Sequence, residues 1–468
     1  MPQNFIACDR DQPLLLPPDL RDWLDEDHLA WFVLESVAEL DLADFYADYR
    51  SDGHGAAAHD PEMMVSLMLY AYAVGERSAR GIERHCREDV AFRVIAANQA
   101  PDHATIARFR ARHEQPLAEL FAQVFGLCAK AGIVDAGLVA IDGTKLAAAA
   151  SERATRDYEQ IAAEIVREAG RIDAAEDEIH GCARGDELPR RVARREGRQA
   201  WIKEALGREQ ERREAEEIPI PKGRSERLEL CRSRLVEDWR TECQAHRDYA
   251  AWRERGVRER GRKAMGPGPK PASPPPRPDA KINLTDPDSR NMKTPRGYLQ
   301  GYNAQIATTK QQIVIAAEII SSGSDFQQLE PMTQAAEREL ESAGVAARPA
   351  VVLADAGYWA NGHIDALRER GIAPLVAPDA HSRAGPRRGR VGGPYDFMRR
   401  ALRTETGARL YSRRQSMVEP VFGDIKANRG AGRLKRRGLA AARSEWRLLT
   451  ATHNLRKLHR HKLGLATG

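Results

Sequence analysis

Two aspartates that each follow a short apolar run are the residues of this chain best suited to chemistry. Residues 138–141 precede Asp142, and residues 351–354 precede Asp355. Both runs have the length and β-branched content of buried strands, and open α/β sheets bind ligands at the carboxyl ends of such strands. Because two carboxylates at one sheet edge repel each other unless a cation neutralises them, the pair predicts a divalent metal and a metal-dependent enzyme.

The elements between the two aspartates decide whether these can meet. Further strands are expected at 302–307, 313–319 and 373–376, and helices near 326–341 and 364–370. An antiparallel meander of three strands that returns through a right-handed helical crossover would set the fourth strand parallel to the first. The two aspartates then share an edge; without that adjacency, each is more simply a turn residue.

A third carboxylate is expected from a helix within residues 411–426. Its apolar stripe consists of Met417, Val418, Val421, Phe422 and Ile425. Glu419 and Lys426, seven residues apart, share a neighbouring polar face with Gly423 between them, and this gap would let a ligand backbone approach. The alternative is a capping box, in which Ser416 and Glu419 close the start of a helix and Pro420 occupies its first turn.

Composition limits the class of protein. A chain of 468 residues that is 42% hydrophobic predicts two or three domains. The six cysteines form no C-x-x-C pair, which argues against a zinc site or a disulfide framework and fits a reducing cytoplasm. The chain shows neither an export signal nor an apolar stretch long enough to span a bilayer, so we expect a cytoplasmic protein without a membrane partner.

The charge distribution predicts a nucleic-acid partner. The net charge is only +5, but residues 421–468 carry twelve Lys or Arg and two acidic residues. Helices with a basic exterior are expected there, and the loop 381–390 is a second basic segment; either could instead be a solubilising surface. The tail residues proposed to bind DNA are Arg433, Lys435, Arg436 and Arg437.

Residues 1–135 are expected to form an all-α, DNA-binding domain. Within it, Asp102 should cap a helix whose Ile106 and Phe109 face inward. The side chains expected on its exposed, DNA-facing side are Arg108, Arg110, Arg112 and His113. A solvated charged surface is the simpler alternative.

Residues 149–280 have the composition of an insertion. They are dense in Arg and Glu with sparse apolar residues at helical spacing, which predicts long helices in a hairpin of coiled-coil type. The segment 266–278, with three consecutive prolines, should be a flexible or polyproline-like linker. This insertion would interrupt an α/β domain made of residues 136–148 and 281–468.

The motifs in their order resemble the catalytic signature of DDE insertion-sequence transposases. The resemblance is carried by residues 142–145, 355–358, 283–290 and 301–305, by the N-terminal helical region, and by Tyr411, Arg414, Glu419 and Lys426. It implies a ribonuclease-H-like mixed sheet with flanking helices, in addition to the insertion and the N-terminal domain. The family usually spaces its Arg and Glu by three residues, whereas four separate Arg414 from Glu419, so Arg413 is an alternative.

The resemblance also implies the chemistry. Asp142, Asp355 and Glu419 would hold two Mg²⁺ or Mn²⁺ ions for in-line phosphoryl displacement on double-stranded DNA, at terminal inverted repeats and at a target. The side chains implied to position the DNA are Lys426, Tyr411 and Arg414, with Lys145 as a weaker candidate. Trp359 could stack on an unpaired base or be buried. Two ends brought together predict a homodimer in the DNA complex.

Three other functions remain open from the sequence. A structure-selective nuclease on the same fold would cleave DNA without joining it. A catalytically inactive DNA-binding remnant is disfavoured by carboxylates at all three positions. A glycosidase with paired carboxylates is disfavoured by the aromatic content of 6% and by the basic tail.

Overall fold

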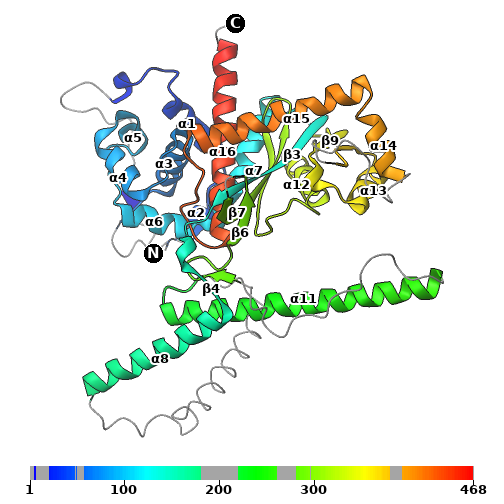
Figure 1. Cartoon of the computed structure of the whole chain (residues 1–468). Helices are drawn as coiled ribbons and strands as arrows, with labels where there is room; N and C mark the ends of the chain where they lie inside the picture. The colour runs from blue at the N-terminus through cyan, green and yellow to red at the C-terminus, as the bar shows by residue number, and fades with distance from the viewer. Residues whose placement is uncertain are drawn as a thin grey trace. The chain divides into compact units, whose positions relative to one another are not determined.

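The structure is a computed structural model that describes residues 5–6, 20–47, 49, 57–180, 220–260, 281–295, 297–379 and 393–466 (Figure 1). The chain divides into two compact units. One unit comprises Met1–Ala148 with Met292–Gly468, and the other comprises Ala149–Asn291. The predicted linker 266–278 and basic loop 381–390 lie outside the described residues.

A six-stranded mixed sheet forms the centre of the larger unit. Its order is β10-β9-β3-β7-β6, with β8 also paired to β7. β3 is antiparallel to β7, β7 is antiparallel to β8, and β9 and β10 run parallel to β3. The predicted meander and the parallel return are therefore confirmed. The strands are β3 Leu138–Ala147, β6 Arg290–Thr294, β7 Gly297–Thr309, β8 Val314–Ile320, β9 Val351–Ala354 and β10 Ala373–Val376.

The first strand is longer than its apolar run. Beyond Asp142, the residues Gly143, Thr144 and Lys145 stay in register with β7, where Lys145 pairs with Asn303. The expectation that the strand ends before Asp142 is wrong, because pairing with a long neighbouring strand outweighs the turn propensity of an Asp-Gly pair. Asp142 consequently projects from the middle of β3.

Helices pack on the sheet and connect its strands. The connection from β8 to β9 contains α12 (Leu329–Ser342), and that from β9 to β10 contains α13 (Asn361–Glu369). α15 packs on the sheet through Met417 and Val418, which are buried against Ala140 of β3 and Leu353 of β9. Because side chains alternate along a strand, Asp142 lies on the same side of β3 as Ala140 and faces α15.

α15 (Glu405–Gly423) begins eleven residues before Ser416, where the predicted capping box would start. Thr404 caps it by accepting a hydrogen bond from the Gly407 N–H at 3.1 Å, so the capping role of Ser416 is wrong and Pro420 lies inside the helix. A proline cannot donate to the Ser416 carbonyl, and the Gln312 side-chain amide donates to it instead at 2.9 Å. The helix continues as a π-helical turn, η5 (Asp424–Asn428), which carries Lys426.

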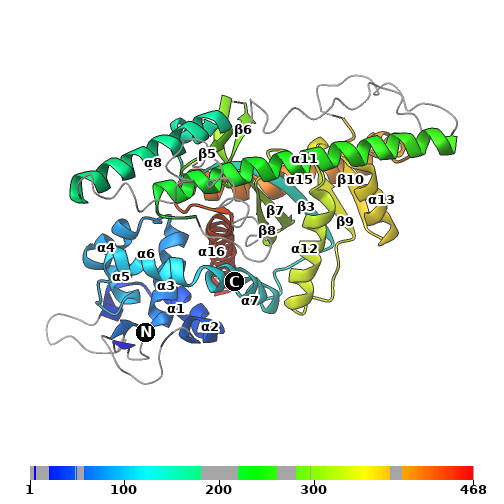
Figure 2. The ribbon, with the colours of Figure 1, turned by 90° about the horizontal axis from the view of Figure 1, so that it is seen from below.

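The N-terminal helices belong to the same unit as the sheet. α3 is almost entirely buried, begins at the cap Asp60 followed by Pro61, and ends at Gly75 with φ 95°. The last helix, α16 (Leu439–Ala466), contacts α3, α7 and β8, so it joins the N-terminal helices to the sheet (Figure 2). The N-terminal helices are α1 Leu29–Ala38, α2 Ala43–Ala47, α3 Pro61–Val74, α4 Ala79–Glu88, α5 Val90–Ile95, α6 His103–Arg112 and α7 Glu114–Lys130.

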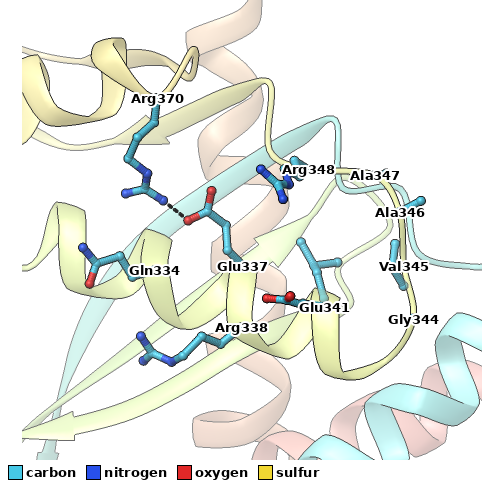
Figure 3. Close-up of a pocket in the computed structure, with 11 residues that line it drawn as sticks. Gln334, Glu337, Arg338, Glu341, Gly344, Val345, Ala346, Ala347, Arg348 and Arg370 are labelled. Carbon is cyan, nitrogen blue, oxygen red and sulfur yellow. Dashed lines mark ion pairs between the residues drawn. The ribbon is translucent and has the colours of Figure 1, made fainter.

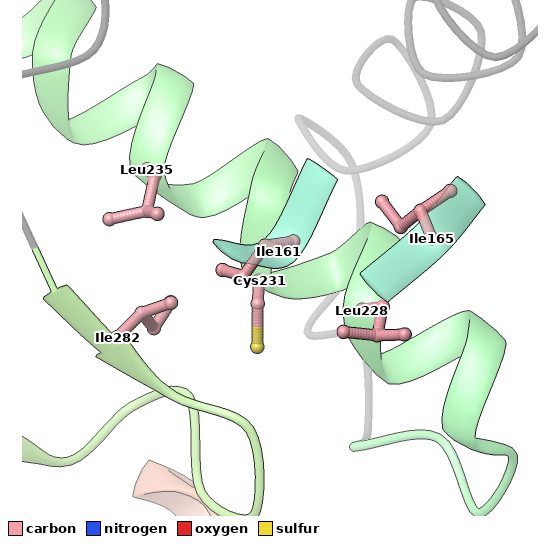
Figure 4. Close-up of a cluster of buried hydrophobic side chains, with 6 residues drawn as sticks. All are labelled: Ile161, Ile165, Leu228, Cys231, Leu235 and Ile282. Carbon is pink, nitrogen blue, oxygen red and sulfur yellow. The ribbon is translucent and has the colours of Figure 1, made fainter. Parts of the chain in front are cut away.

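The smaller unit contains two long helices, α8 (Tyr158–His180) and α11 (Arg224–Arg260), and a two-stranded ribbon of β4 (Thr155–Asp157) with β5 (Lys281–Asn283). Figure 4 shows the cluster of buried side chains between them: Ile161, Ile165, Leu228, Cys231, Leu235 and Ile282. The two long helices contact each other through this cluster, and the predicted hairpin of coiled-coil type stays a prediction. In the described ranges, no helix is both long and apolar enough to cross a bilayer.

Candidate active site

The predicted neighbourhood of the two aspartates is confirmed by the pairing of their strands. β3 and β9 are hydrogen-bonded in parallel, and their last paired residues are Ala140 and Leu353. Asp142 and Asp355 each lie two residues beyond this pair. The two carboxylates therefore emerge side by side at one edge of the sheet.

Asp142 is partly buried and bound by an arginine. Its Oδ2 accepts a hydrogen bond from Arg414 Nη1 at 2.6 Å, and its Oδ1 accepts one from the Gly143 N–H at 2.8 Å. Burial raises the pKa of Asp142 to about 6; the guanidinium of Arg414 opposes this shift, and the charges of Asp355 and Asp325 add to it. Arg414 thus supplies the positive charge that this repelling group of carboxylates requires.

Asp355 caps a short 3₁₀ turn, η4 (Ala356–Tyr358), by accepting a hydrogen bond from the Gly357 N–H at 2.8 Å. Tyr358 is fully buried behind it and donates to Gln305 Oε1. Burial, together with the charges of the surrounding aspartates, raises the pKa of Tyr358 well above its usual value. The adjacent Trp359 is only 6% exposed, so it is buried and is not free to stack on an unpaired base.

α15 and η5 line the same edge with the predicted cationic residues. Lys426 Nζ donates to Thr144 Oγ1 at 2.9 Å and to the Lys145 carbonyl at 3.3 Å, and burial lowers its pKa. Tyr411 lies beside Arg414, whose guanidinium carbon is 6.0 Å from the centre of the ring. Glu419 lies on the same helix between Arg414 and Lys426, with its side chain exposed to solvent.

A further acidic residue, Asp325, joins this edge and was missed from the sequence. Its Oδ1 accepts hydrogen bonds from Asn303 Nδ2 and Gln305 Nε2, both at 2.8 Å, and lies 3.7 Å from Lys145 Nζ. It follows β8 by five residues, so no aspartate stands directly after that apolar run. The direction of β8 could have revealed it, because β8 runs parallel to β3 and its carboxyl end reaches the same edge.

The donor set of this edge suits a hard divalent cation. It offers carboxylate oxygens, and the fully buried Asn303 leaves its Oδ1 without a hydrogen-bond donor. In the described parts of the chain, no three acidic, His or Cys side chains are already arranged as a metal-binding group. Arg414 and Lys145 instead hold Asp142 and Asp325 as counter-charges.

The helix predicted to face DNA exposes only part of its basic side. Asp102 caps α6 as predicted, and Arg108 is exposed, whereas Arg112 is partly covered and lies over the ring of Tyr49. The expected exposure of Arg110 is wrong: it is 9% exposed and donates to the Arg77 carbonyl at 2.8 Å. His113 is buried as well. Helical spacing in the sequence could not indicate the burial of Arg110, because its partner, the Arg77 carbonyl, belongs to another segment of the chain.

The basic segment before α16 also exposes only some of its charged side chains. Arg433, Lys435 and Arg437 are exposed, as expected for a DNA-facing surface. Arg436 departs from that expectation, because it is partly buried and forms an ion pair with Glu114 of α7. Arg436 therefore helps to attach this segment to the N-terminal helices.

The hollow in Figure 3 lies away from the sheet edge that carries Asp142 and Asp355. It has a volume of about 610 Å³ and is lined by α12, by the loop that leads into β9 and by Arg370, which pairs with Glu337. This loop precedes the amino end of β9, whereas Asp355 follows its carboxyl end. We therefore assign no part of the candidate active site to it.

Two family models match the chain. Residues 18–112 match a transposase domain (DUF772), and residues 274–455 match a transposase DDE domain. The second match contains Asp355, Glu419, Lys426 and the newly found Asp325, while Asp142 lies before it. Searches of the curated proteins and of the solved structures found no significant match. A mixed α/β domain with clustered aspartates and two transposase matches defines a DNA-processing protein. The chain is an insertion-sequence transposase of the DDE type.

Proposed function

We propose that this transposase cuts and joins DNA at the ends of an insertion sequence by metal-dependent phosphodiester chemistry on a ribonuclease-H-like core. The main support is the parallel pairing of β3 and β9, the strands from which Asp142 and Asp355 emerge. Further support comes from α15, which contacts both strands and carries Glu419.

Asp142, Asp355 and Glu419 are the residues that would hold two Mg²⁺ or Mn²⁺ ions. When bound, such ions activate the attacking hydroxyl group and stabilise the leaving oxygen of an in-line displacement. The partly buried position of Asp142 and Arg414 favours this role, because charges act more strongly where water is partly excluded.

The cationic side chains of the edge would position the scissile phosphate. Lys426 is fixed against Thr144, so its ammonium group is held at the edge before DNA arrives. Arg414 neutralises Asp142 in the free protein, and its guanidinium would also be able to bind a phosphate oxygen at this edge. Tyr411 and Lys145 lie next to these groups and would make further contacts with the DNA backbone.

Exposed or partly exposed basic side chains elsewhere in the chain would add contacts with the DNA backbone. Arg108, Arg112, Arg433, Lys435 and Arg437 would bind the phosphates of the terminal repeats and of the target. Synapsis of two element ends requires a homodimer in the DNA complex, and we place this reaction in a prokaryotic cytoplasm, at the nucleoid.

The test uses labelled DNA that carries the flanking element ends, incubated with the protein in Mg²⁺, in Mn²⁺ or in EDTA. We expect nicking at the ends and strand joining that depend on the metal and disappear in Asp142→Asn. Cleavage of any DNA without joining would identify a nuclease instead, and binding without cleavage in every condition would identify an inactive DNA-binding protein.

A further inference from the structure

Three strands of the sheet deliver aspartates to one edge because they run in the same direction. β3 carries Asp142, β9 precedes Asp355, and the connection after β8 carries Asp325. The DDE chemistry proposed above uses the first two with Glu419 and assigns nothing to Asp325.

Asp325 lies against the turn that holds Asp355. A side chain at Gly357 would place its Cβ 3.0 Å from Asp355 Oδ1 and 3.5 Å from Asp325 Oδ2, so both oxygens border the same point. A Cβ at Gly143 would lie 2.7 Å from Asp325 Oδ1 and 2.9 Å from Asn303 Oδ1. Two glycines therefore leave room for the Asp325 side chain to sit between β3 and the Asp355 turn.

The two oxygens of Asp325 differ in their surroundings. Oδ1 accepts both amide donors, from Asn303 and Gln305, which fixes the carboxylate in place. Oδ2 is the oxygen that borders the turn of Asp355. The neighbouring Asn303 Oδ1 is fully buried and has no donor, so an oxygen that could serve a cation lies beside this carboxylate.

The charge of Asp325 needs an explanation beyond these hydrogen bonds. A neutral carbonyl oxygen would also accept from both amides, through weaker hydrogen bonds, and would not repel Asp355 and Asp142. Lys145, at 3.7 Å, compensates part of this charge, while Asp355 forms no ion pair among the described residues. Arg414 interacts electrostatically with Asp355, but its guanidinium is hydrogen-bonded to Asp142. A carboxylate kept beside two others that share one guanidinium indicates a cation that binds Asp325 and Asp355.

We propose that Asp325 is an additional acidic residue at the sheet edge that carries Asp142 and Asp355. It binds a divalent cation jointly with Asp355, and this cation replaces Lys145 as its counter-charge. This inference rests on the proposed function, because it adds a ligand to the metal site assigned there. It predicts that metal affinity depends on the charge of residue 325, whereas the fold depends only on its ability to accept hydrogen bonds.

The test measures Mn²⁺ binding by the full-length protein without DNA, by calorimetry and by the free Mn²⁺ signal in electron paramagnetic resonance. Asp325→Asn keeps the acceptor for Asn303 and Gln305 and removes the charge. We expect a Mn²⁺ dissociation constant raised about 10- to 100-fold with an unchanged melting temperature. The matched control is Asp365→Asn, an exposed aspartate of α13, which should bind Mn²⁺ like the wild type.

Two outcomes overturn the inference, and they are distinguishable. If Asp325→Asn binds Mn²⁺ like the wild type while Asp355→Asn does not, Asp325 only supports the fold and the proposed function stands. If the wild type binds no Mn²⁺, or Asp142→Asn and Asp355→Asn bind it normally, the metal site itself fails.

Discussion

At the scale of single residues, the candidate site is a balance of charges. Asp142, Asp325 and Asp355 repel one another at one sheet edge, and Arg414 of α15 and Lys145 of β3 compensate their charge. Lys426 of η5 is bound to Thr144 at the same edge. Such a site can bind a ligand that carries both positive and negative charge, as a metal-bound phosphodiester does. The pKa of Asp142 therefore depends on how closely Arg414 approaches its carboxylate.

Replacing Arg414 should move the acidic limb of the pH profile. A cation beside a carboxylate stabilises the ionised form, so Arg414→Gln should raise the pKa of Asp142 above its value of about 6. Since Asp142 must be ionised to bind a metal, the rise of kcat/KM with pH should shift to higher pH. Steady-state cleavage from pH 5 to 9 measures this shift.

Arg413→Gln is the matched control for this experiment. Arg413 is exposed on the same helix and has no ion pair among the described residues. It should leave the acidic limb in place. Equal shifts in both variants would show that general positive charge, rather than the Arg414 contact, sets the pKa of Asp142.

At the scale of elements, the helix end that carries Lys426 is held by a cluster of ion pairs. Asp424 of η5 accepts from His453 Nδ1 at 3.0 Å and Arg456 Nη1 at 2.9 Å, and it lies 3.1 Å from Arg429 Nη2. Burial alone would raise the pKa of Asp424, but the hydrogen bond from His453 and the charge of Arg429 outweigh it and hold the pKa well below its usual value. The π-helical turn is thereby attached to α16.

Asp424→Asn should destabilise the protein by about 3–5 kcal/mol, because it leaves the buried Arg429 without its charge partner. The folded-state pKa is depressed, so this stabilisation is present above the unfolded-state value of about 3.9 and is lost as the pH falls below it. Urea unfolding at pH 7 and at pH 3 measures both effects. The difference from the wild type should shrink at pH 3; a constant difference, or one matched by Asp365→Asn, would contradict the assignment.

At the scale of the whole molecule, the larger unit is held together across its full sequence length. Arg77, from the loop before α4, donates to Glu445 of α16 at 2.8 Å and to the carbonyls of Arg433 and Gly430, both at 2.9 Å. The same segment pairs with the end of β3, where the Ala147 N–H donates to the Gly432 carbonyl at 3.0 Å. The N-terminal helices thus support the segment that follows Lys426.

Arg77→Met should cost about 3–5 kcal/mol of unfolding free energy, because Glu445 is then buried without a counter-charge. Glu445→Gln should destabilise as well, and the double variant should lose less than the two single losses combined, with a coupling of about 0.5–3 kcal/mol. Denaturant unfolding of the four proteins completes this cycle. Additive losses would mean that the N-terminal helices and α16 are stabilised independently.

Local sequence patterns were sufficient for five of the six strands of the sheet, but not for β6 (Arg290–Thr294) or for every side chain. The runs 351–354 and 373–376 are strands as predicted, because their apolar residues have no alternative to burial. Asp142 lies inside its strand because β7 extends the pairing, which a turn-like Asp-Gly pair conceals. Arg110 is buried and Asp325 reaches the edge through contacts with distant segments, and such contacts leave no periodic signal in the sequence.

The central claim is that the carboxylates assigned to catalysis bind the metal ions, and metal-specific rescue tests it most directly. Asp142→Cys, Asp355→Cys and Glu419→Cys would each be assayed for strand transfer in Mg²⁺ and in Mn²⁺, beside Asp365→Cys. Because a thiolate binds Mn²⁺ better than it binds Mg²⁺, we predict that the three variants are inactive in Mg²⁺ and regain activity in Mn²⁺, while the control is active in both. Activity in Mg²⁺ alone, or a loss in all three that Mn²⁺ does not restore, would contradict the account.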